Sequence, residues 1–300
     1  MPMLDVVGVG TNSVDDVVIT QKGLLEAISS GKACVQARHV FIGGQTATAM
    51  CGCAQWGLNT AYVGVFGSDE NGRMVRRALE ERGVATEHAI VSEGPNRTAV
   101  IVIDGNGRRT VLWHRTENLS LAPAQLNARS LQARLVHLDD DDQAVALRVA
   151  DAARHEGTPV TSDIEHATSC TEQLIASVTY PILNEHLPTT LTGESDPERA
   201  LRKLRRLNPG VLCMTLGERG AAALEGERFH MAPAFSVDVA DNTGAGDMFR
   251  AGFIYGVLHG WAIPEILRFA NAAGAASCRT LGAIPSVPSL EDVRQFLKRR

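Results

Sequence analysis

A glycine-rich tract near the C-terminus, DNTGAGD at residues 241–247, contains the residue types that phosphate chemistry requires. Its glycines allow the backbone to turn tightly and to approach a ligand closely. The apolar stretch that follows predicts a helix, and the free N–H groups at a helix start favour an anion. The tract therefore predicts phosphoryl transfer, with Asp247 as base and the amides of Gly244, Ala245 and Gly246 as an anion hole. The alternative is an ordinary turn in which Asp247 caps a helix.

The composition narrows the class of protein. The chain has 300 residues, 44% of them hydrophobic, and a formal net charge of −5. This mild negative charge does not favour nucleic acid or an anionic membrane as a partner, because both require a basic surface. The sequence has no run of about eighteen apolar residues and begins without the features of a signal peptide. We therefore expect a cytoplasmic protein.

Short apolar runs alternate with amphipathic stretches along most of the chain. Runs of this length are typical of strands that helices cover on both faces. The amphipathic stretches, at residues 70–82, 143–156 and 196–207, predict such helices. We therefore expect an α/β fold with a mostly parallel central sheet, with strands near residues 4–9, 61–66, 135–138, 159–161, 180–183 and 211–216.

Two regions depart from this alternation. Residues 98–104 and 108–113 are strand-like, and Asp104-Gly105-Asn106-Gly107 between them is a strong hairpin signal. Residues 14–42 also contain strand-like pieces. We expect one domain over residues 1–300, with a small β lid contributed by roughly 14–42 and 96–114. An open sheet edge on such a lid favours pairing with a second copy, so we also expect a homodimer through the lid.

Four tracts resemble the ribokinase-like, or PfkB, carbohydrate kinases. They are GGQTATAM at 43–50, WGLNTAYVGVFGSDENG at 56–72, MTLGERGA at 214–221 and DNTGAGDMFRAGF at 241–253. Their order and spacing match the family over nearly the whole chain. The resemblance implies a three-layer ribokinase-like (Rossmann-like) domain. It also implies an ATP-dependent kinase that transfers the γ-phosphoryl group to a hydroxyl of a sugar or sugar-like small molecule.

The resemblance also implies which residues bind the sugar. In the family, an aspartate after the first strand holds sugar hydroxyls, and here Asp15 occupies that place. Asp140, Asp141 and Asp142 are expected to be solvated, and so is Asp16. The implied substrate-binding residues are Ser13, Asp15, Gly43, Gly44, Thr48 and Asp139.

A further set of residues matches the family's nucleotide site. Thr215, Gly217 and Gly220 match the loop that contacts ATP phosphate and ribose, although an ordinary β-turn is the alternative. Asn271 matches a position beside the adenine, with an exposed helical asparagine as the alternative. Asn184 matches a position that organises Mg²⁺ and phosphate. A monovalent cation such as K⁺ is implied beside the anion hole, with oxygens from Asp241, Thr243, Ser277, Thr280, Gly282 and Ser286.

The chain departs from the family at two places. Relatives often carry an Asn-x-x-Glu motif, but here Asn184 is followed directly by Glu185, and Leu187 stands at the third position. The sequence therefore does not show how Mg²⁺ is ordered. Gln45 and Thr48 replace the Lys and Asn of ribose kinases, so ribose is not the expected substrate.

The sequence lacks the motifs of two other classes of nucleotide-binding protein. The only Gly-Lys pair, at 31–32, is followed by Ala33, so the P-loop motif is absent, and Gly8-Val9-Gly10 does not complete a dinucleotide-binding fingerprint. The serious competitor is a catalytically silent sugar- or nucleotide-binding regulator on the same scaffold. Loss of the family glutamate favours this regulator, whereas retention of Asp247 and the glycine loop opposes it.

Overall fold

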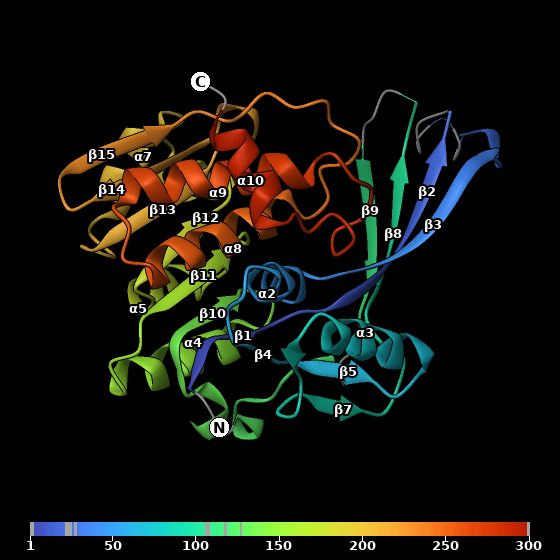
Figure 1. Cartoon of the computed structure of the whole chain (residues 1–300), viewed down its shortest axis with the longest axis horizontal. Helices are drawn as coiled ribbons and strands as arrows, with labels where there is room; N and C mark the ends of the chain where they lie inside the picture. Colours follow the sequence, from blue (N-terminus) through green and yellow to red (C-terminus); the bar gives the residue numbers. More distant parts are fainter. Residues whose placement is uncertain are drawn as a thin grey trace.

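A nine-stranded sheet forms the centre of the molecule in this computed structural model, which describes residues 3–21, 26, 29–105, 109–116, 119–126 and 128–298 (Figure 1). Strands β13 to β6 pair in parallel, and the two pairs at the other edge are antiparallel. The predicted mostly parallel sheet is therefore confirmed. The strand order is β15 (Arg228–Ala232), β14 (Ala221–Glu225), β13 (Val211–Thr215), β12 (Tyr180–Leu183), β11 (Val160–Ile164), β10 (Ala133–Asp139), β1 (Leu4–Val9), β4 (Thr60–Val63) and β6 (Val84–Ala85).

Helices cover both faces of this sheet (Figure 1). One face packs against α2 (Gln45–Gln55), α3 (Glu70–Glu81), α8 (Ala245–Leu258), α9 (Ile263–Ser277) and α10 (Leu290–Leu297). The other packs against α4 (Gln143–His155), α5 (Thr171–Ser177), α6 (His186–Thr192) and α7 (Pro197–Leu204). The connections contain the 3₁₀ turns η2 (Pro123–Gln125), η3 (Ala128–Leu131) and η4 (Gly217–Arg219), and a small sheet of β5 (Val65–Gly67) and β7 (Ile90–Ser92).

Alternating side chains of the central strands build two separate cores. Val6 and Leu135 pack with α2 and α8, whereas Val7 and Val136, their chain neighbours, pack with α4 and α5. Successive side chains of a strand point to opposite faces, so an uninterrupted apolar run fills both cores. This explains why the runs are apolar throughout. No helix in the described ranges is long and apolar enough to cross a membrane.

A second sheet, the lid sheet, projects beside the central one (Figure 1). In the described residues its order is β3 (Val35–Gly43), β2 (Ser13–Thr20), β8 (Thr98–Ile103) and β9 (Arg109–His114). Strands β8 and β9 pair antiparallel from Thr98↔His114 to Ile103↔Arg109, as the hairpin signal predicts. Residues 106–108 of the predicted turn lie outside the described residues.

The lid sheet is tied to the body by charged groups. Arg97, just before β8, and Arg115, just after β9, both pair with Asp141 beyond the end of β10. The three side chains are only 16–23% exposed. Burial acts to raise the pKa of Asp141, but the hydrogen bond and charge of Arg97 hold it below its usual value. The carboxylate therefore stays ionised between two guanidinium groups.

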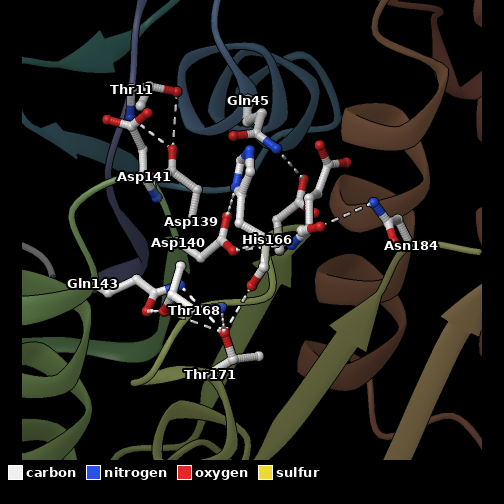
Figure 2. Close-up of polar contacts among 12 residues, drawn as sticks. Thr11, Gln45, Asp139, Asp140, Asp141, Gln143, His166, Thr168, Thr171 and Asn184 are labelled. Atoms are coloured by element: carbon white, nitrogen blue, oxygen red, sulfur yellow. Dashed lines mark hydrogen bonds and ion pairs between the residues drawn. The ribbon is translucent and has the colours of Figure 1, made fainter. Parts of the chain in front are cut away.

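The predicted solvation of Asp140 to Asp142 is wrong. Asp140 is 2% exposed and accepts hydrogen bonds from the amides of Glu165 (3.1 Å) and His166 (2.8 Å), as Figure 2 shows for His166. Asp142 accepts from the amide of Leu121 at 3.1 Å. These aspartates follow the buried strand β10, at the edge of the sheet where backbone N–H groups of neighbouring loops need hydrogen-bond acceptors.

We predict that Asp141→Asn loosens the lid sheet. The neutral side chain cannot balance two partly buried arginines, so the free energy of unfolding should fall by about 1–3 kcal/mol. Thermal melts measure this loss. The matched control is Asp151→Asn, because Asp151 forms an exposed pair with Arg154 and should change stability by less than about 1 kcal/mol. Equal losses in the two variants would contradict the prediction.

Candidate active site

The parallel strands bring acidic side chains together at one edge of the central sheet. Asp139 ends β10, and its strand partner Asp163 is followed by Glu165 just beyond the end of β11. Helix α8 begins at the same edge, since Asp247 in its first turn interacts electrostatically with Glu165 and Asp139. Open α/β sheets bind ligands at the carboxyl ends of their strands. This edge is therefore the candidate active site.

The start of α8 presents backbone amides without acceptors. The amide of Ala245 donates to the carbonyl of Asn242 at 3.2 Å. In contrast, the amides of Gly244, Gly246 and Asp247 find no acceptor in the described part of the chain. Gly244 has φ +82°, and a Cβ there would lie 3.0 Å from Cα of Ala283, so only glycine fits this turn. The predicted anion hole thus has free donors on both sides of Ala245.

Asp247 lies in the first turn of α8, where solvent reaches it although protein atoms surround it closely. Burial raises the pKa of Asp247 to about 8; Arg250 opposes this shift, and the carboxylates of Glu165, Asp15 and Asp139 add to it. A carboxyl with a pKa near the working pH can both accept and release a proton. The environment therefore suits Asp247 to the role of a general base.

Asp163 connects two helices to the acidic edge. Its carboxylate accepts from Nη2 of Arg250 at 2.5 Å and from Nε2 of Gln45 at 3.3 Å. Figure 2 shows the Gln45 amide pointing into this group from the start of α2. Thr48, one turn further along α2, is fully buried, and its hydroxyl has no partner among the described residues. Gln45, and not Thr48, is therefore the α2 side chain that contacts Asp163.

Asp15 projects from the lid sheet into the site. It is 6% exposed, and the Ser13 hydroxyl donates to it at 2.7 Å. A Cβ at Gly43 would lie 2.3 Å from Oδ2 of Asp15, so glycine leaves the carboxylate room. Gly44 follows with φ +100° and starts α2. Burial raises the pKa of Asp15, although the charge of Arg109 opposes the shift.

The oxygens of Asp139 are occupied by protein donors. Oδ2 accepts from the amide of Thr11 (2.7 Å), its hydroxyl (2.9 Å) and the hydroxyl of Thr46 (2.9 Å), as Figure 2 shows for Thr11. Burial raises the pKa of Asp139 to about 6. Asp139 thereby links the loop after β1 to α2. Direct contact between Asp139 and a substrate stays a prediction.

The predicted nucleotide loop follows β13. Thr215 ends the strand, and Gly217 starts η4 with φ +56°. A Cβ at Gly220 would lie 2.1 Å from the carbonyl oxygen of Ala232, so the loop packs closely on the end of β15. Glu185 faces this loop, because its carboxylate pairs with Arg219 at 3.0 Å.

The two predicted asparagines have different surroundings. Asn184 uses its side-chain oxygen to accept from the amides of His186 (3.2 Å) and Leu187 (2.9 Å) at the start of α6, and its Nδ2 lies 3.4 Å from the carbonyl of Glu165 (Figure 2). Asn271 is buried and donates to the carbonyls at 232 (2.9 Å) and 233 (3.1 Å). A groove of about 990 Å³ adjoins this second contact, lined by residues 231–238 with Pro264, Arg268, Arg279 and Phe296.

The residues of the predicted cation site belong to the loop before α8 and to the end of α9 with the loop that follows it. Asp241 accepts from the amide and hydroxyl of Thr243 (2.9 and 2.7 Å) and from the amide of Gly282 (2.8 Å). The hydroxyls of Ser277 and Ser286 donate to nearby carbonyls, and the amide of Thr280 donates to the carbonyl of Ser277. Within the described ranges, no group of three or more His, Cys, Asp or Glu side chains forms a metal site.

Sequence reasoning missed several residues of this site. Asp163 and Glu165 lie at the end of a predicted strand. Because open α/β sheets bind ligands at the carboxyl ends of their strands, this position could have identified them as site residues. Arg250 follows Asp247 by one helical turn, so periodicity would place it on the same side of α8. The contact of Arg109 depends on tertiary structure: its Nη1 donates to the Thr243 hydroxyl at 2.8 Å and so connects the lid sheet to the glycine tract.

Comparisons with known proteins agree with this architecture. The family model for pfkB family carbohydrate kinases matches residues 4–290. A ribokinase of Arabidopsis thaliana is 29% identical over 277 residues, covering 87% of this chain and 73% of that protein. An ATP-dependent ribose-1-phosphate kinase of Halopiger xanaduensis is 28% identical over 290 residues, covering 95% of each chain.

Solved structures show the same fold. The structure of Arabidopsis thaliana ribokinase complexed with ribose and ATP superposes with a TM-score of 0.82 at 24% identity, covering 99% of this chain and 100% of that chain. A ribokinase from Thermotoga maritima superposes with a TM-score of 0.83 at 23% identity, with the same coverage.

We predict that Asp247 lowers the stability of the ligand-free protein as the pH rises. Its pKa is about 8 in the folded chain but 3.8 ordinarily, so between these values the folded state holds the proton more tightly, and stability is lost as the pH increases. Asp247→Asn does not titrate. The melting temperature of this variant, minus that of the wild type, should therefore grow by at least about 2 °C from pH 5 to pH 8, the shift expected for 1 kcal/mol. A difference that does not change with pH would show that burial does not perturb this carboxyl.

Proposed function

Because the chain belongs to the pfkB family of carbohydrate kinases, we propose that it transfers the γ-phosphoryl group of ATP to a hydroxyl of a sugar or sugar-like small molecule, with Asp247 as the general base. The observation that carries this proposal is the combination of a carboxyl with a raised pKa and backbone amides without acceptors at the start of α8. Backbone amides can donate hydrogen bonds to a phosphate, and the carboxylate can accept the proton of the substrate hydroxyl.

In the proposed reaction, Asp247 accepts the proton of the substrate hydroxyl while the hydroxyl oxygen attacks the γ-phosphorus. The bond from that phosphorus to the β–γ bridging oxygen breaks, and ADP leaves with the electron pair. The amides of residues 244–247 lie where they can donate to the phosphoryl oxygens as charge redistributes, although Ala245 also serves Asn242. These groups are fixed before the reaction, so little reorganisation is needed.

The sugar would lie between the lid sheet and the body. Asp15 and Ser13 supply oxygens from the lid sheet, and Gly43 and Gly44 leave space for a close approach. The remaining proposed sugar-site residues are Thr48 and Asp139, of which Asp139 positions Thr11 and Thr46. Closure of the lid sheet over the sugar would exclude water from the reacting groups.

ATP would bind on the side of α8 that faces away from the proposed sugar site. Thr215, Gly217 and Gly220 form a loop at the end of β13 that contacts the segment held by Asn271. The groove beside that segment has space for the adenine. Asn184 contacts the carbonyl of Glu165, and its neighbour Glu185 pairs with Arg219 of this loop. We therefore assign the phosphates to the space between this loop and α8.

The two proposed metal ions, Mg²⁺ and K⁺, would both be bound by oxygen ligands. Mg²⁺ is usually held by one or two carboxylates together with substrate phosphates and water, and the carboxylate of Glu165 fits that requirement. Phosphate charge would be neutralised by the bound Mg²⁺. For K⁺, the loop before α8 and the end of α9 with its following loop offer oxygens from Asp241, Thr243, Ser277, Thr280, Gly282 and Ser286.

The lid sheet also supports the proposed homodimer. Val40, Val100 and Leu112 occupy one cross-strand row with Asp16 on a single face, and they are 50%, 39% and 52% exposed. All six residues of the edge strand β9 are exposed. Exposed apolar side chains beside a strand that forms the sheet edge in the described residues are suited to pairing with a second copy.

The activity is tested by a coupled ADP-release assay over a panel of sugars and sugar phosphates. We expect turnover with at least one of them, and Asp247→Asn should lower kcat at least about a hundredfold while leaving substrate affinity largely intact. The exposed Asp151→Asn is the control. Binding of sugars without turnover by the wild-type chain would indicate the catalytically silent regulator instead.

Light scattering tests the dimer. We expect twice the chain mass of 32.1 kDa at micromolar concentration, and Leu112→Lys should shift the protein to the single-chain mass because it replaces an exposed apolar side chain beside Val100 by a charge. Val91→Lys is the matched control, since Val91 is 52% exposed on β7, outside the lid sheet. A wild-type protein of single-chain mass would contradict the dimer.

A further inference from the structure

Arg250 is a buried cation in the middle of the candidate site. It is 2% exposed and is the largest of the fully buried side chains. Burying a charge is unfavourable unless hydrogen bonds and an opposite charge compensate for it. The contacts of Arg250 therefore show whether it is a structural residue or one that awaits a ligand.

The protein satisfies only part of this guanidinium. Nη2 donates to Oδ1 of Asp163 at 2.5 Å and lies 3.9 Å from Oε1 of Glu165. Nε is buried without any partner, and Nη1 also has no acceptor among the residues that the structure describes. An arginine carries five N–H donors in a rigid plane. Most of them remain free here, which a purely structural ion pair would not require.

The free donors lie against the start of α8. An ideal Cβ at Gly246 would lie 2.7 Å from Nη1 of Arg250 and 3.8 Å from its Cζ. The guanidinium thus extends back along its own helix to the turn where the amides of Gly246 and Asp247 also have no acceptor. Side-chain and backbone donors therefore meet at one place. A tetrahedral anion with several oxygens can use both sets.

The carboxylates around Arg250 fix its orientation. Asp163 holds Nη2 and is itself held by Nε2 of Gln45. Burial disfavours the charge on Arg250, but Asp163, Glu165 and Asp247 raise its pKa overall, so the cation persists. A cation is needed here, since these carboxylates would otherwise repel an approaching phosphate.

We propose that Nη1 of Arg250 donates to the terminal phosphate of ATP and stabilises the phosphoryl group as it moves to the substrate hydroxyl. The inference rests on the proposed function and adds a charged donor to it. Arg250 forms no covalent bond: the phosphorus–oxygen bonds change as described above, and the hydroxyl proton still goes to Asp247. This position of the Arg250 guanidinium also explains why residue 246 is glycine, because a side chain there would displace the guanidinium.

The test compares two nucleotides that differ at the terminal phosphate. Calorimetry measures binding of a non-hydrolysable ATP analogue and of ADP, each with Mg²⁺, to the full chain and to Arg250→Gln. We expect the variant to bind the analogue at least about tenfold more weakly, with ADP affinity within about twofold, and kcat to fall about 10²–10³-fold. Arg250→Lys should be intermediate, because it keeps the charge without the fork.

The controls separate this role from folding. Arg206→Gln is the matched arginine variant, because Arg206 pairs with Glu172 on the surface. Should Arg250→Gln fail to fold with Asp163 left unpaired, the double variant Arg250→Gln/Asp163→Asn removes both charges and undergoes the same comparison. Gly246→Ala should likewise weaken the analogue more than ADP, since it displaces the guanidinium without removing its charge.

A folded variant that binds both nucleotides as the wild type does would overturn the inference, and so would an equal loss of affinity for both. In either case wild-type turnover would leave the proposed function intact. A wild-type chain that binds neither nucleotide and phosphorylates no sugar would overturn the proposed function, and this inference with it.

Discussion

The site depends on the confinement of several carboxylates around one buried arginine. Asp163, Glu165 and Asp247 approach Arg250 where the carboxyl ends of the strands meet the start of α8. Like charges at such short range are unfavourable, and removal from water increases the cost. The fold accepts this cost because the surrounding sheet and helices are apolar and closely packed. Burial, with a smaller contribution from the neighbouring carboxylates, raises the pKa of Asp247, so the same unfavourable confinement makes it a usable base.

A polar network holds this arrangement in place. Asn12 donates from Nδ2 to the Tyr62 hydroxyl (2.9 Å) and to the carbonyl of Val65 (2.8 Å), and it accepts from Nδ2 of Asn96 at 3.0 Å. Asn12 precedes the first lid strand and Asn96 precedes β8. The base of the lid sheet is therefore fixed to the body, and at its far end Arg109 donates to the hydroxyl of Thr243 in the glycine tract. This combination suits a sheet that closes over a substrate.

Local signals predicted the parts of the site that depend on the backbone. The glycines at 244 and 246 were identified because tight turns and close approach require them, and those at 43 and 44 from the family resemblance. The structure shows a positive φ or a crowded Cβ at each of the four. Asp247 was identified because it follows such a turn. The acidic run at 140–142 was misjudged because charge alone indicates solvent exposure, and its acceptors were needed by amides distant in sequence.

The sequence by itself determined the α/β fold, the order of its strands along the chain and the family to which it belongs. These follow from the period of apolar residues and from short motifs, which are local properties. Only the tertiary structure decided which side chains share the site. Asp163 and Arg250 are 87 residues apart in the chain, and Thr11 and Asp139 are 128 apart. Such pairings depend on how strands and helices pack, and no local pattern contains that information.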